Sequence, residues 1–380
     1  MTTKKLYYES CHLQEFSATV VTCQETDDGY HITLDATAFY PEGGGQASDI
    51  GTLGSVRVLH AKELGEEVVH LCDGPLTPGS TVTGRVDYDR RFDLMQQHTG
   101  EHILSGIIHA KYGYHNTGFH VGSDTVTIDF DGMIPAEDIP VLEELANRVI
   151  WQNLPVHCSC PSPEELKEIP YRSKRELPWP VRIVEVPNTD ICACCGVHVA
   201  RTGEVGSIKL LSSIKFHQGV RMELVCGGRA LRWFQQVFEQ NRLVSQAFSA
   251  KVLETGIAAQ KVNEQLAGEK LRANTLQKQV FAAIAKGYEN AGNVVHFEEN
   301  LAPGNVRELA DAIVKVCGGT AAVFSGDDVS GYSLCVLGDG AKELGSAAAN
   351  ALNGRGGGKP DAFQGSLKAS RAEIDAFFRK

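Results

Sequence analysis

The sequence predicts an α+β protein of several domains: a small N-terminal β-barrel, an α+β metal-binding domain, a helical arm and a C-terminal α/β domain. Three observations lead to this prediction. Residues 1–90 carry short runs of strand composition, residues 229–287 contain no proline, and residues 288–380 alternate strand and helix patterns. Residues 91–228 contain both strand patterns and helix patterns. At 380 residues the chain is long enough for two or three domains with substantial cores.

The composition is that of an ordinary soluble globular protein, with 42% hydrophobic and 22% charged residues. The N-terminus has no apolar signal region, and no stretch approaches the ~18 apolar residues of a membrane span. We therefore expect a cytoplasmic protein without a membrane partner. Eleven cysteines, several of them in Cys192-Ala-Cys-Cys195, favour reduced thiols and metal ligation over disulfides.

The net charge of −11 argues against nonspecific nucleic-acid binding by the whole surface. Phosphate binding depends on where the cations lie, and two local groups are candidates: Arg90-Arg91 and Arg172-Ser-Lys-Arg175. Each is more typical of a solvated surface than of a phosphate contact.

Residues 1–90 are expected to form the barrel. Strand composition occurs at 16–22, 30–34, 56–59, 67–71 and 81–86, with turn residues between several of the runs. The segment Ala38-Phe-Tyr-Pro-Glu-Gly-Gly-Gly-Gln46 departs from this pattern, because three consecutive glycines weaken a strand. Two interpretations stay open: a long mobile loop, or backbone that approaches a ligand closely where side chains would obstruct it.

Residues 91–228 are expected to form the α+β domain. The patterns predict helices over 93–110 and 140–152 and strands over 126–130, 181–184, 206–211 and 219–225. The first helix has Phe92, Met95, Ile103 and Ile107 as core positions on or beside it. The second is expected to turn Val141, Leu142, Leu145 and Val149 inward. The proline-rich segment from 161 to 180 is expected to be loop and turn.

Two short motifs in this region indicate a metal site. In His98-Thr-Gly-Glu-His102, a separation of four residues brings both imidazoles to one face of a helix, one turn apart. In Cys194-Cys-Gly-Val-His198, about ninety residues later, the same separation joins a thiolate and a third imidazole. Either motif alone is weak, but three histidines and one cysteine together suit zinc better than magnesium, calcium or an iron-sulfur cluster. A zincin-type peptidase is disfavoured, because Glu101 does not directly follow His98.

Residues 229–287 are expected to form a helical hairpin broken near Thr255-Gly256. Apolar residues keep a near-helical spacing that places them in one stripe: Val262, Leu266, Ala273, Leu276, Val280 and Ile284. A spacer arm is the favoured interpretation. Self-association through the stripe is the alternative.

Residues 288–380 show strand patterns at 294–297, 321–324 and 332–337 and a helix pattern at 305–317. The segment 353–361 is predicted to be a glycine-rich loop. It is not a P-loop, since its spacing differs and no Ser or Thr follows the lysine. Backbone N–H groups and two cations suit phosphate or nucleic-acid binding, against the alternative of a plain packing loop. The candidate residues are Arg355, Gly356, Gly357, Gly358 and Lys359.

Four motifs in this order resemble the alanyl-tRNA editing proteins of the AlaX type, free-standing relatives of the editing domain of alanyl-tRNA synthetase. The motifs are residues 40–46, residues 98–102, Cys194 to His198 followed by Thr202-Gly-Glu-Val-Gly206, and residues 356–361. The resemblance covers essentially the full length. It implies a barrel over 1–90, a zinc-binding editing domain over 91–228, an arm over 229–287 and a DHH-associated domain over 288–380, as in the long form of the family.

The resemblance implies a carboxylic ester hydrolase that removes serine, with glycine as a further substrate, from mischarged tRNA(Ala). By matched position, the zinc ligands are His98, His102, Cys194 and His198. Val197 stands where the family has threonine, which removes a hydroxyl but no ligand. Cys192 and Cys195 are extra thiols that we treat as substitutes in a mutant. The resemblance also places Gly43, Gly44, Gly45 and Gln46 near the substrate.

An aminoacyl ester is already activated, so the protein needs chiefly to hold it near a water and to stabilise the developing oxyanion. Zinc either lowers the pKa of a bound water toward ~7 or acts as a template, and both roles stay open. If all four protein ligands bind tightly, no coordination position stays open, which favours the template. Alanine is smaller than serine, so sparing Ala-tRNA requires a polar group satisfied only by the serine hydroxyl. Thr117, in His115-Asn-Thr-Gly-Phe-His120, stands where the resemblance suggests this partner; an ordinary turn threonine is the alternative.

Two other functions stay open. A noncatalytic, zinc-stabilised tRNA-binding adaptor would use the metal only to support the fold. A metal-dependent hydrolase of another ester or amide would have no reason to carry the arm and the glycine-rich domain, which counts against it. A homodimer through the helical arm or the C-terminal domain is compatible with each function.

Overall fold

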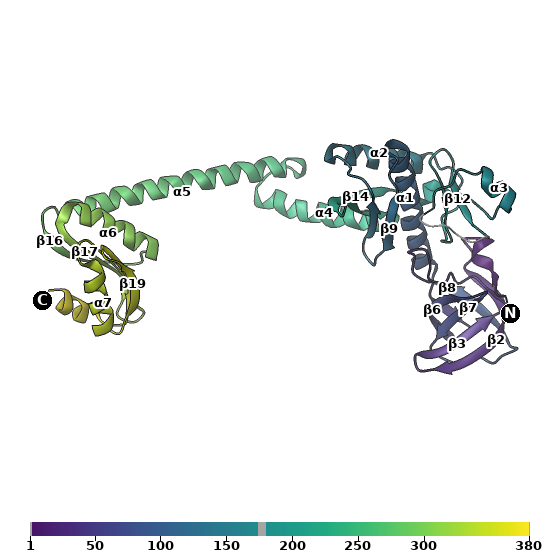
Figure 1. Cartoon of the computed structure of the whole chain (residues 1–380), viewed down its shortest axis with the longest axis horizontal. Coiled ribbons are helices and arrows are strands. Elements are labelled where there is room, and N and C mark those ends of the chain that lie inside the picture. Colours follow the sequence, from purple (N-terminus) through teal and green to yellow (C-terminus); the bar gives the residue numbers. More distant parts are fainter. Residues whose placement is uncertain (1, 174–179, 380) are drawn as a thin grey trace. The chain divides into compact units, whose positions relative to one another are not determined.

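The structure is a computed structural model that describes residues 2–173 and 180–379 (Figure 1). The chain divides into two compact units, Met1–Arg242 and Leu243–Lys380. Both units combine helices with sheets, which confirms the predicted α+β multidomain class. None of the described helices is both long enough and apolar enough to cross a membrane.

The first unit begins with six strands whose pairing closes a ring in the order β2-β3-β7-β6-β5-β8 (Figure 1). Their bounds are β2 Glu15–Thr26, β3 Gly29–Leu34, β5 Gly51–Leu53, β6 Val56–Leu64, β7 Glu67–Cys72 and β8 Thr81–Val86. All five predicted runs lie within these strands. Alternation explains why: Phe16, Ala18 and Val20 are buried in the ring while the residues between them are more exposed. Short elements flank the ring: β1 Lys4–Lys5, β4 Ala36–Thr37 and the 3-10 helix η1 Leu6–Tyr8.

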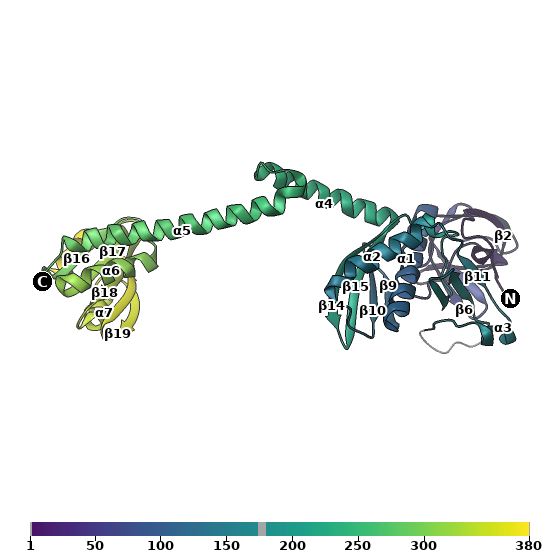
Figure 2. The same cartoon turned by 90° about the horizontal axis from the view of Figure 1, so that it is seen from above.

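The second part of this unit is a four-stranded sheet in the order β14-β15-β10-β9, with two helices packed on it (Figure 2). The strands are β9 Asn116–Val121, β10 Val126–Phe130, β14 Ile208–Phe216 and β15 Gly219–Cys226, and the helices are α1 Tyr88–Tyr112 and α2 Ile139–Trp151. Helix α1 begins five residues before the predicted start, because Asp87 caps it by accepting a hydrogen bond from the backbone N–H of Arg90. Gly113 ends it with a φ of 74°.

Helix α2 corrects one prediction. Leu142 is buried, but Val141 and Leu145 are 46% and 38% exposed. The buried stripe is instead Leu142, Ala146 and Ile150, which recur every four residues along one face. Because the middle residue of this stripe is an alanine, the sequence pattern did not show which face of the helix is buried.

A three-stranded sheet in the order β11-β12-β13 completes the unit. Its strands are β11 His157–Ser159, β12 Ile183–Val186 and β13 Asp190–Ala193, and the 3-10 helices nearby are η2 Ala136–Asp138 and η3 Thr202–Val205. The proline-rich segment, predicted to be only loop and turn, contains the short helix α3 Pro163–Glu168. Ser162 and Glu165 form a capping box there, and Pro163 occupies the first turn, where its missing N–H costs nothing.

Arg91 corrects a second prediction, since its side chain is 0% exposed and is therefore neither a solvated surface group nor a phosphate contact. Its Nε donates to both carboxylate oxygens of Asp49 at 2.9 Å, and its Nη2 donates to the carbonyl of Ala38. The pair joins helix α1 to the loop that carries the triple glycine. In the other basic group, Lys174 and Arg175 lie outside the described residues.

The predicted helical region contains α4 Gly227–Ala247, the 3-10 helix η4 Val252–Glu254 and α5 Thr255–Lys286. The break predicted near Thr255-Gly256 lies just before these residues, which begin α5. The stripe residues Val262, Leu266, Leu276 and Val280 are exposed.

The second unit contains a five-stranded sheet in the order β16-β17-β18-β20-β19. The strands are β16 Gly292–Glu298, β17 Gly318–Asp327, β18 Gly331–Leu337, β19 Arg355–Lys359 and β20 Ala362–Leu367, and the helices are α6 Pro303–Cys317, α7 Ala341–Ala351 and α8 Arg371–Phe378. Alternate residues of β17 belong to two cores. Val323 packs with α5 and α6, while Phe324 packs with α7 and α8.

The glycine-rich segment 353–361, predicted to be a loop, contains strand β19, which pairs with β20. Glycine fits this strand because a Cβ at Gly358 would lie 1.8 Å from the carbonyl oxygen of Ala362. The close approach of two backbones determines the conformation of this segment, and the local sequence does not show that approach.

Candidate metal centre

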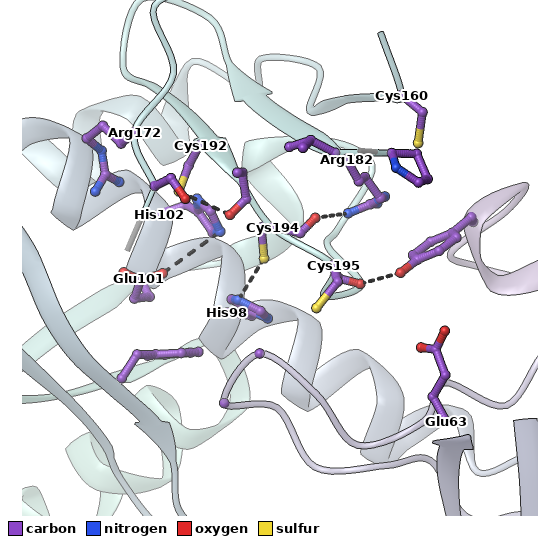
Figure 3. A pocket seen from close by; sticks show the side chains of 18 of the residues that line it. Glu63, His98, Glu101, His102, Cys160, Arg172, Arg182, Cys192, Cys194 and Cys195 are labelled. Carbon is purple, nitrogen blue, oxygen red and sulfur yellow. Dashed lines mark hydrogen bonds and ion pairs between the residues drawn. The ribbon is translucent and has the colours of Figure 1, made fainter. Parts of the chain in front are cut away.

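The structure brings the two predicted half-sites together. Ligand atoms of His98, His102, Cys194 and His198 all lie within 4.8 Å of one another. The first two residues come from α1, and the other two from the loop that follows β13. The His198 ring lies 4.5 Å and 4.7 Å, centroid to centroid, from the rings of His98 and His102. Figure 3 shows Cys194 pointing toward His98, whose Nε2 is 3.4 Å from its Sγ.

In two of the histidines, a hydrogen bond from Nδ1 orients the ring. Nδ1 of His98 donates to Oε1 of Gln46 at 2.8 Å, and Nδ1 of His102 donates to Oδ2 of Asp190 at 2.9 Å. These bonds leave Nε2 of each ring for the cluster. Holding a ligating imidazole through its second nitrogen is the usual arrangement at protein metal sites.

Each motif needs its glycine for packing. A Cβ on Gly196 would lie 2.2 Å from Cε1 of His98, and a Cβ on Gly100 would lie 2.2 Å from Sγ of Cys226. The two motifs are also joined directly, since the backbone N–H of Val199 donates to the Thr99 hydroxyl at 3.2 Å. The sequence between the ligands therefore builds the contact that brings the half-sites together.

Arg182 holds the cysteine loop from the other side. Its Nη1 donates to the carbonyls of Cys194 and Gly196 at 2.9 Å and 2.8 Å, and its guanidinium lies 4.6 Å from the centroid of the Tyr8 ring. The Tyr8 hydroxyl in turn donates to the carbonyl of Cys195 at 2.8 Å. The loop is thus anchored through its backbone, which leaves the Cys194 thiol facing the histidines.

The electrostatics favour the metal-binding protonation state at two residues of the cluster, Cys194 and His198. Burial acts to raise the pKa of Cys194, but His98 and His102 outweigh it and hold the pKa well below its usual value. Burial, together with the charge of His98, holds the pKa of His198 well below its usual value. A thiolate and a neutral imidazole are the forms that bind metal.

His198 supplies the clearest sign that something is to be bound. Both of its ring nitrogens are buried, and neither has a hydrogen-bond partner among the described residues. An orphaned buried polar atom is costly unless a ligand satisfies it. A borderline-soft set of three imidazoles and one thiolate fits zinc by donor chemistry.

Asp190 and Arg172 were missed by sequence reasoning as parts of this site. Arg172 donates to both carboxylate oxygens of Asp190, from Nε at 2.7 Å and from Nη2 at 2.9 Å. Burial acts to lower the pKa of His102, but the bond to Asp190 outweighs it and the pKa stands well above its usual value. His102, Asp190 and Cys192 form a second group with metal-ligand spacing, but Arg172 already occupies this carboxylate.

A cavity of about 880 Å³ opens beside the cluster (Figure 3). His98, His102 and Cys194 line it, and so do three of the residues expected near the substrate: Thr117, Gly44 and Gly45. Gly43 and Gln46 are not among the lining residues. Gln46 is 1% exposed and lies behind His98, where it orients the ring.

The triple glycine forms a tight turn at the cavity. Gly43 and Gln46 exchange two backbone hydrogen bonds of 3.0 Å and 3.1 Å, and Gly44 and Gly45 have φ values of 60° and 82°. A Cβ on Gly45 would lie 2.7 Å from Cδ1 of Phe119. The segment is therefore an ordered turn, and its residues Gly44 and Gly45 line the cavity.

The remaining candidate residues lie in the second unit. Arg355, Gly356, Gly357, Gly358 and Lys359 form β19, and all five are exposed. Strand β19 is at the edge of its sheet, so its two cations are open to a partner.

Family models match three parts of the chain. Residues 2–90 match tRNA synthetases class II (A), residues 181–221 match the threonyl and alanyl tRNA synthetase second additional domain, and residues 277–380 match the DHHA1 domain. The second of these matches contains Cys194 and His198.

Curated relatives match nearly the whole chain. An alanine–tRNA ligase of Thermofilum pendens is 32% identical over 97% of this chain, which spans 43% of the ligase. The alanyl-tRNA editing protein Aarsd1 of Mus musculus is 29% identical over 97% of this chain and 95% of its own length, and Aarsd1-A of Xenopus laevis is 27% identical over 97% and 96%. The chain is therefore a relative of the alanyl-tRNA editing proteins, with class II (A) synthetase, second additional and DHHA1 regions in that order.

Proposed function

We propose that this protein is an aminoacyl-tRNA deacylase of the cytoplasm that removes serine, and also glycine, from mischarged tRNA(Ala). The observation that carries the proposal is the buried Cys-His₃ cluster beside a cavity of about 880 Å³. Its context supports the proposal, since relatives that align with nearly the whole chain are named alanyl-tRNA editing proteins. The size of the cavity lies within the range of small-molecule sites, about 300–1,000 Å³, and suits a terminal aminoacyl-adenosine.

In this proposal His98, His102, Cys194 and His198 hold one zinc ion. Bound there, zinc would supply a fixed positive charge at the cavity wall that polarises or orients an ester carbonyl. Four protein ligands favour the orienting role. Arg182 and Asp190 hold the cysteine loop and His102 in place, so that the cluster is rigid before substrate arrives.

Thr117 is proposed to select serine over alanine. The residue is exposed, lines the cavity and donates from its hydroxyl to the Asp129 carbonyl at 3.3 Å. Its hydroxyl oxygen can still accept a hydrogen bond from the serine side chain. A polar partner is what rejection of the smaller alanine requires. The alternative, a threonine with no substrate contact, predicts no change in selectivity on its replacement.

The other parts of the chain serve tRNA binding in this proposal. In this proposal the chain consists of a barrel over 1–90, an editing domain over 91–228, an arm over 229–287 and a DHH-associated domain over 288–380. Arg355 and Lys359, exposed on an edge strand, would contact tRNA phosphate, and the exposed stripe of α5 would space the parts or pair two copies.

The test is release of amino acid from purified Ser-tRNA(Ala), Gly-tRNA(Ala) and Ala-tRNA(Ala), comparing the wild type with Cys194→Ala. We expect the wild type to release serine quickly, to spare alanine, and to lose serine release in the variant. A folded, zinc-loaded wild type that binds tRNA(Ala) but releases nothing would overturn the proposal in favour of a noncatalytic adaptor.

A further inference from the structure

A second cavity, of about 740 Å³, lies within the first unit and has no role in the function proposed so far. Its wall comes from the first turns of α1, the start of α4, the turn after β9 and Ala47, which follows the glycine segment. We call it the arginine cavity, after three residues that line it: Arg90, Arg229 and Arg232. Three cations meet here although the chain has a net charge of −11, so the total charge does not describe this surface.

Arg229 holds the wall of the arginine cavity together. The residue is 7% exposed, and it donates to Oδ2 of Asp93 from Nε at 2.9 Å and from Nη2 at 2.7 Å. Its Nη1 donates to the carbonyl of Gly122 at 2.7 Å. These bonds join the start of α4 to α1 and to the turn after β9, elements that lie together in Figure 1. Arg229 is therefore structural, and it compensates the charge of Asp93.

The other two arginines are open to a ligand. Arg90 is exposed and forms no ion pair among the described residues; its Nη2 donates a long 3.5 Å hydrogen bond to the carbonyl of Ser48. The side chain of Arg232 is 64% exposed, and its Nη2 lies 3.9 Å from an oxygen of Asp93 that already accepts from Arg229. A guanidinium without a close carboxylate can bind a phosphate group through two parallel hydrogen bonds.

The arginine cavity neighbours the cavity beside the metal centre, because two segments run from one to the other. On β9, Phe119 lines the metal-centre cavity and Val121 lines the arginine cavity, two residues further along the same face of the strand. In the glycine segment, Gly45 lines the first cavity and Ala47 the second. The backbone N–H of Val121 donates to the carbonyl of Gly45 at 3.2 Å, which joins the two segments.

This spacing matches that of a nucleic-acid strand. Two residues of a strand span about 7 Å, roughly the rise of two stacked nucleotides. An RNA strand whose 3′ end lies at the metal centre would therefore reach the arginine cavity with the nucleotides next to that end. Each of these nucleotides carries a phosphate, the group that exposed arginines bind.

We propose that the arginine cavity binds the sugar-phosphate backbone of the acceptor strand of the tRNA, with Arg90 and Arg232 contacting its phosphates. The inference rests on the proposed function and deepens it, because it assigns a surface to the part of the tRNA next to the aminoacyl end. Such contacts position the strand without reading its sequence, and they make its affinity depend on salt.

Binding of two stable analogues to the full chain tests the proposal without any chemical step. The first is 3′-deoxy-3′-(L-serylamino)adenosine, and the second is an RNA hairpin with the acceptor stem of tRNA(Ala) that ends in the same nucleoside. We expect the wild type to bind the hairpin more tightly than the nucleoside. Arg90→Gln and Arg232→Gln should each weaken hairpin binding about 3- to 10-fold. Each should also lower the slope of log affinity against log salt by about 0.7–1, and neither should change nucleoside binding.

Matched variants separate a local contact from a general loss of charge. Arg57→Gln removes an arginine whose side chain is 71% exposed on the barrel and lines neither cavity, so affinity and slope should stay those of the wild type. Arg90→Lys keeps the charge and should keep the slope. Asp89→Asn removes a carboxylate that lines the arginine cavity, and it should tighten hairpin binding about 2- to 5-fold.

Three results would overturn the proposal. The first is an unchanged salt slope in both Arg90→Gln and Arg232→Gln, and the second is an equal loss of hairpin and nucleoside binding in these variants. The third concerns free phosphate, which shares the chemistry of the RNA backbone. Inorganic phosphate in large excess, at constant ionic strength, should displace little of the hairpin, and complete displacement would identify a site for a free anion.

The two proposals fail in different ways. If hairpin binding depends on Arg90 and Arg232 but the wild type releases no amino acid from any tRNA(Ala), the proposed deacylase activity fails while the arginine cavity stands as an RNA contact. If the wild type releases serine and hairpin binding is the same in the two variants, the activity stands and the role of the arginine cavity is refuted.

Discussion

Asp190 and His102 are separated by 88 residues in sequence, yet Oδ2 of Asp190 accepts a 2.9 Å hydrogen bond from Nδ1 of His102. Arg172 donates to both oxygens of the same carboxylate, so three residues from α1, the sheet β11-β12-β13 and the segment after α3 form one buried relay. The relay determines which nitrogen of His102 faces the cluster. Metal affinity should therefore depend on a residue that does not bind the metal.

Asp190→Asn should lower zinc affinity about 10- to 100-fold, the usual effect of removing a carboxylate that orients a ligating imidazole. The amide can still accept from His102 but carries no charge to support the ring. Competition with a chromophoric chelator at constant pH measures the change. Asp124→Asn, in an exposed turn where the carboxylate accepts from the Ser123 hydroxyl at 3.0 Å, is the matched control. Equal affinities in wild type and Asp190→Asn would contradict the relay.

Gly196→Ala should weaken zinc binding severely, because the added Cβ would lie 2.2 Å from Cε1 of His98 and must displace the ring or the cysteine loop. Zinc content after dialysis against a weak chelator measures the loss. Gly268→Ala in α5 is the control, since a Cβ there meets nothing within 4 Å among the described residues and alanine favours a helix by up to about 1 kcal/mol. Full zinc retention in Gly196→Ala would show that this close approach does not constrain the site.

Thr117→Val should slow serine release about tenfold, the value of one lost hydrogen bond, and leave glycine release unchanged. Glycine has no side-chain hydroxyl to recognise, so the ratio of the two rates isolates the hydroxyl contact. Thr127→Val on the adjacent strand β10, which does not line the cavity, should leave the ratio as it is. A ratio that is unchanged in Thr117→Val would return Thr117 to the role of an ordinary structural threonine.

Arg91→Met should destabilise the first unit by about 3–5 kcal/mol, because it leaves Asp49 as a buried carboxylate without its partner. The double variant Arg91→Met/Asp49→Leu should recover much of this loss, since an apolar pair avoids the uncompensated charge. Urea unfolding followed by circular dichroism measures both. If the single and double variants unfold at the same urea concentration, the buried ion pair is not the origin of the loss.

His70, fully buried in the barrel, should make the first unit sensitive to mild acid. Burial lowers the pKa of His70 from 6.5 to about 4, while Nδ1 donates to the Ile32 carbonyl at 3.0 Å. The unfolded chain then takes up a proton below about pH 6.5 that the folded chain takes up only near pH 4. Stability is therefore lost as pH falls through this window and is unaffected by His70 above it, a loss of about 3 kcal/mol in all.

Comparison of the wild type with His70→Gln isolates this contribution, because other groups titrate equally in both proteins. Urea midpoints at pH 7 and pH 4.5 should differ more in the wild type than in the variant. An equal shift in both would show that His70 does not titrate differently on folding.

The elements that could be predicted from sequence are those whose signal is local. Phe16, Ala18 and Val20 alternate with polar residues, and this pattern needs no knowledge of the partner strands. Strand β5 has only three residues, which is too short to show an alternation of buried and exposed side chains, and it was not predicted. The capping box of Ser162 and Glu165 is also a local signal. The prolines around it led instead to a prediction of loop and turn.

The parts that could not be predicted depend on distant partners. Segment 355–359 is a strand because β20 pairs with it, and nothing within those five residues indicates this. In the candidate metal centre, the spacing within each half-site predicted which side chains lie together. The residues that orient them, Asp190 and Gln46, come from elements 88 and 52 residues away from their histidines and carry no local signature.

The most direct test of the account is serine release from Ser-tRNA(Ala) before and after metal removal. The wild type is stripped with a chelator, checked by circular dichroism for retained secondary structure, and then given one equivalent of zinc. We predict that release is lost in the stripped protein, returns with zinc, and does not return in His198→Ala, whose ring nitrogens have no hydrogen-bond partner among the described residues. A folded, metal-free protein that still releases serine at the full rate would contradict the claim that the Cys-His₃ cluster is the centre of the activity.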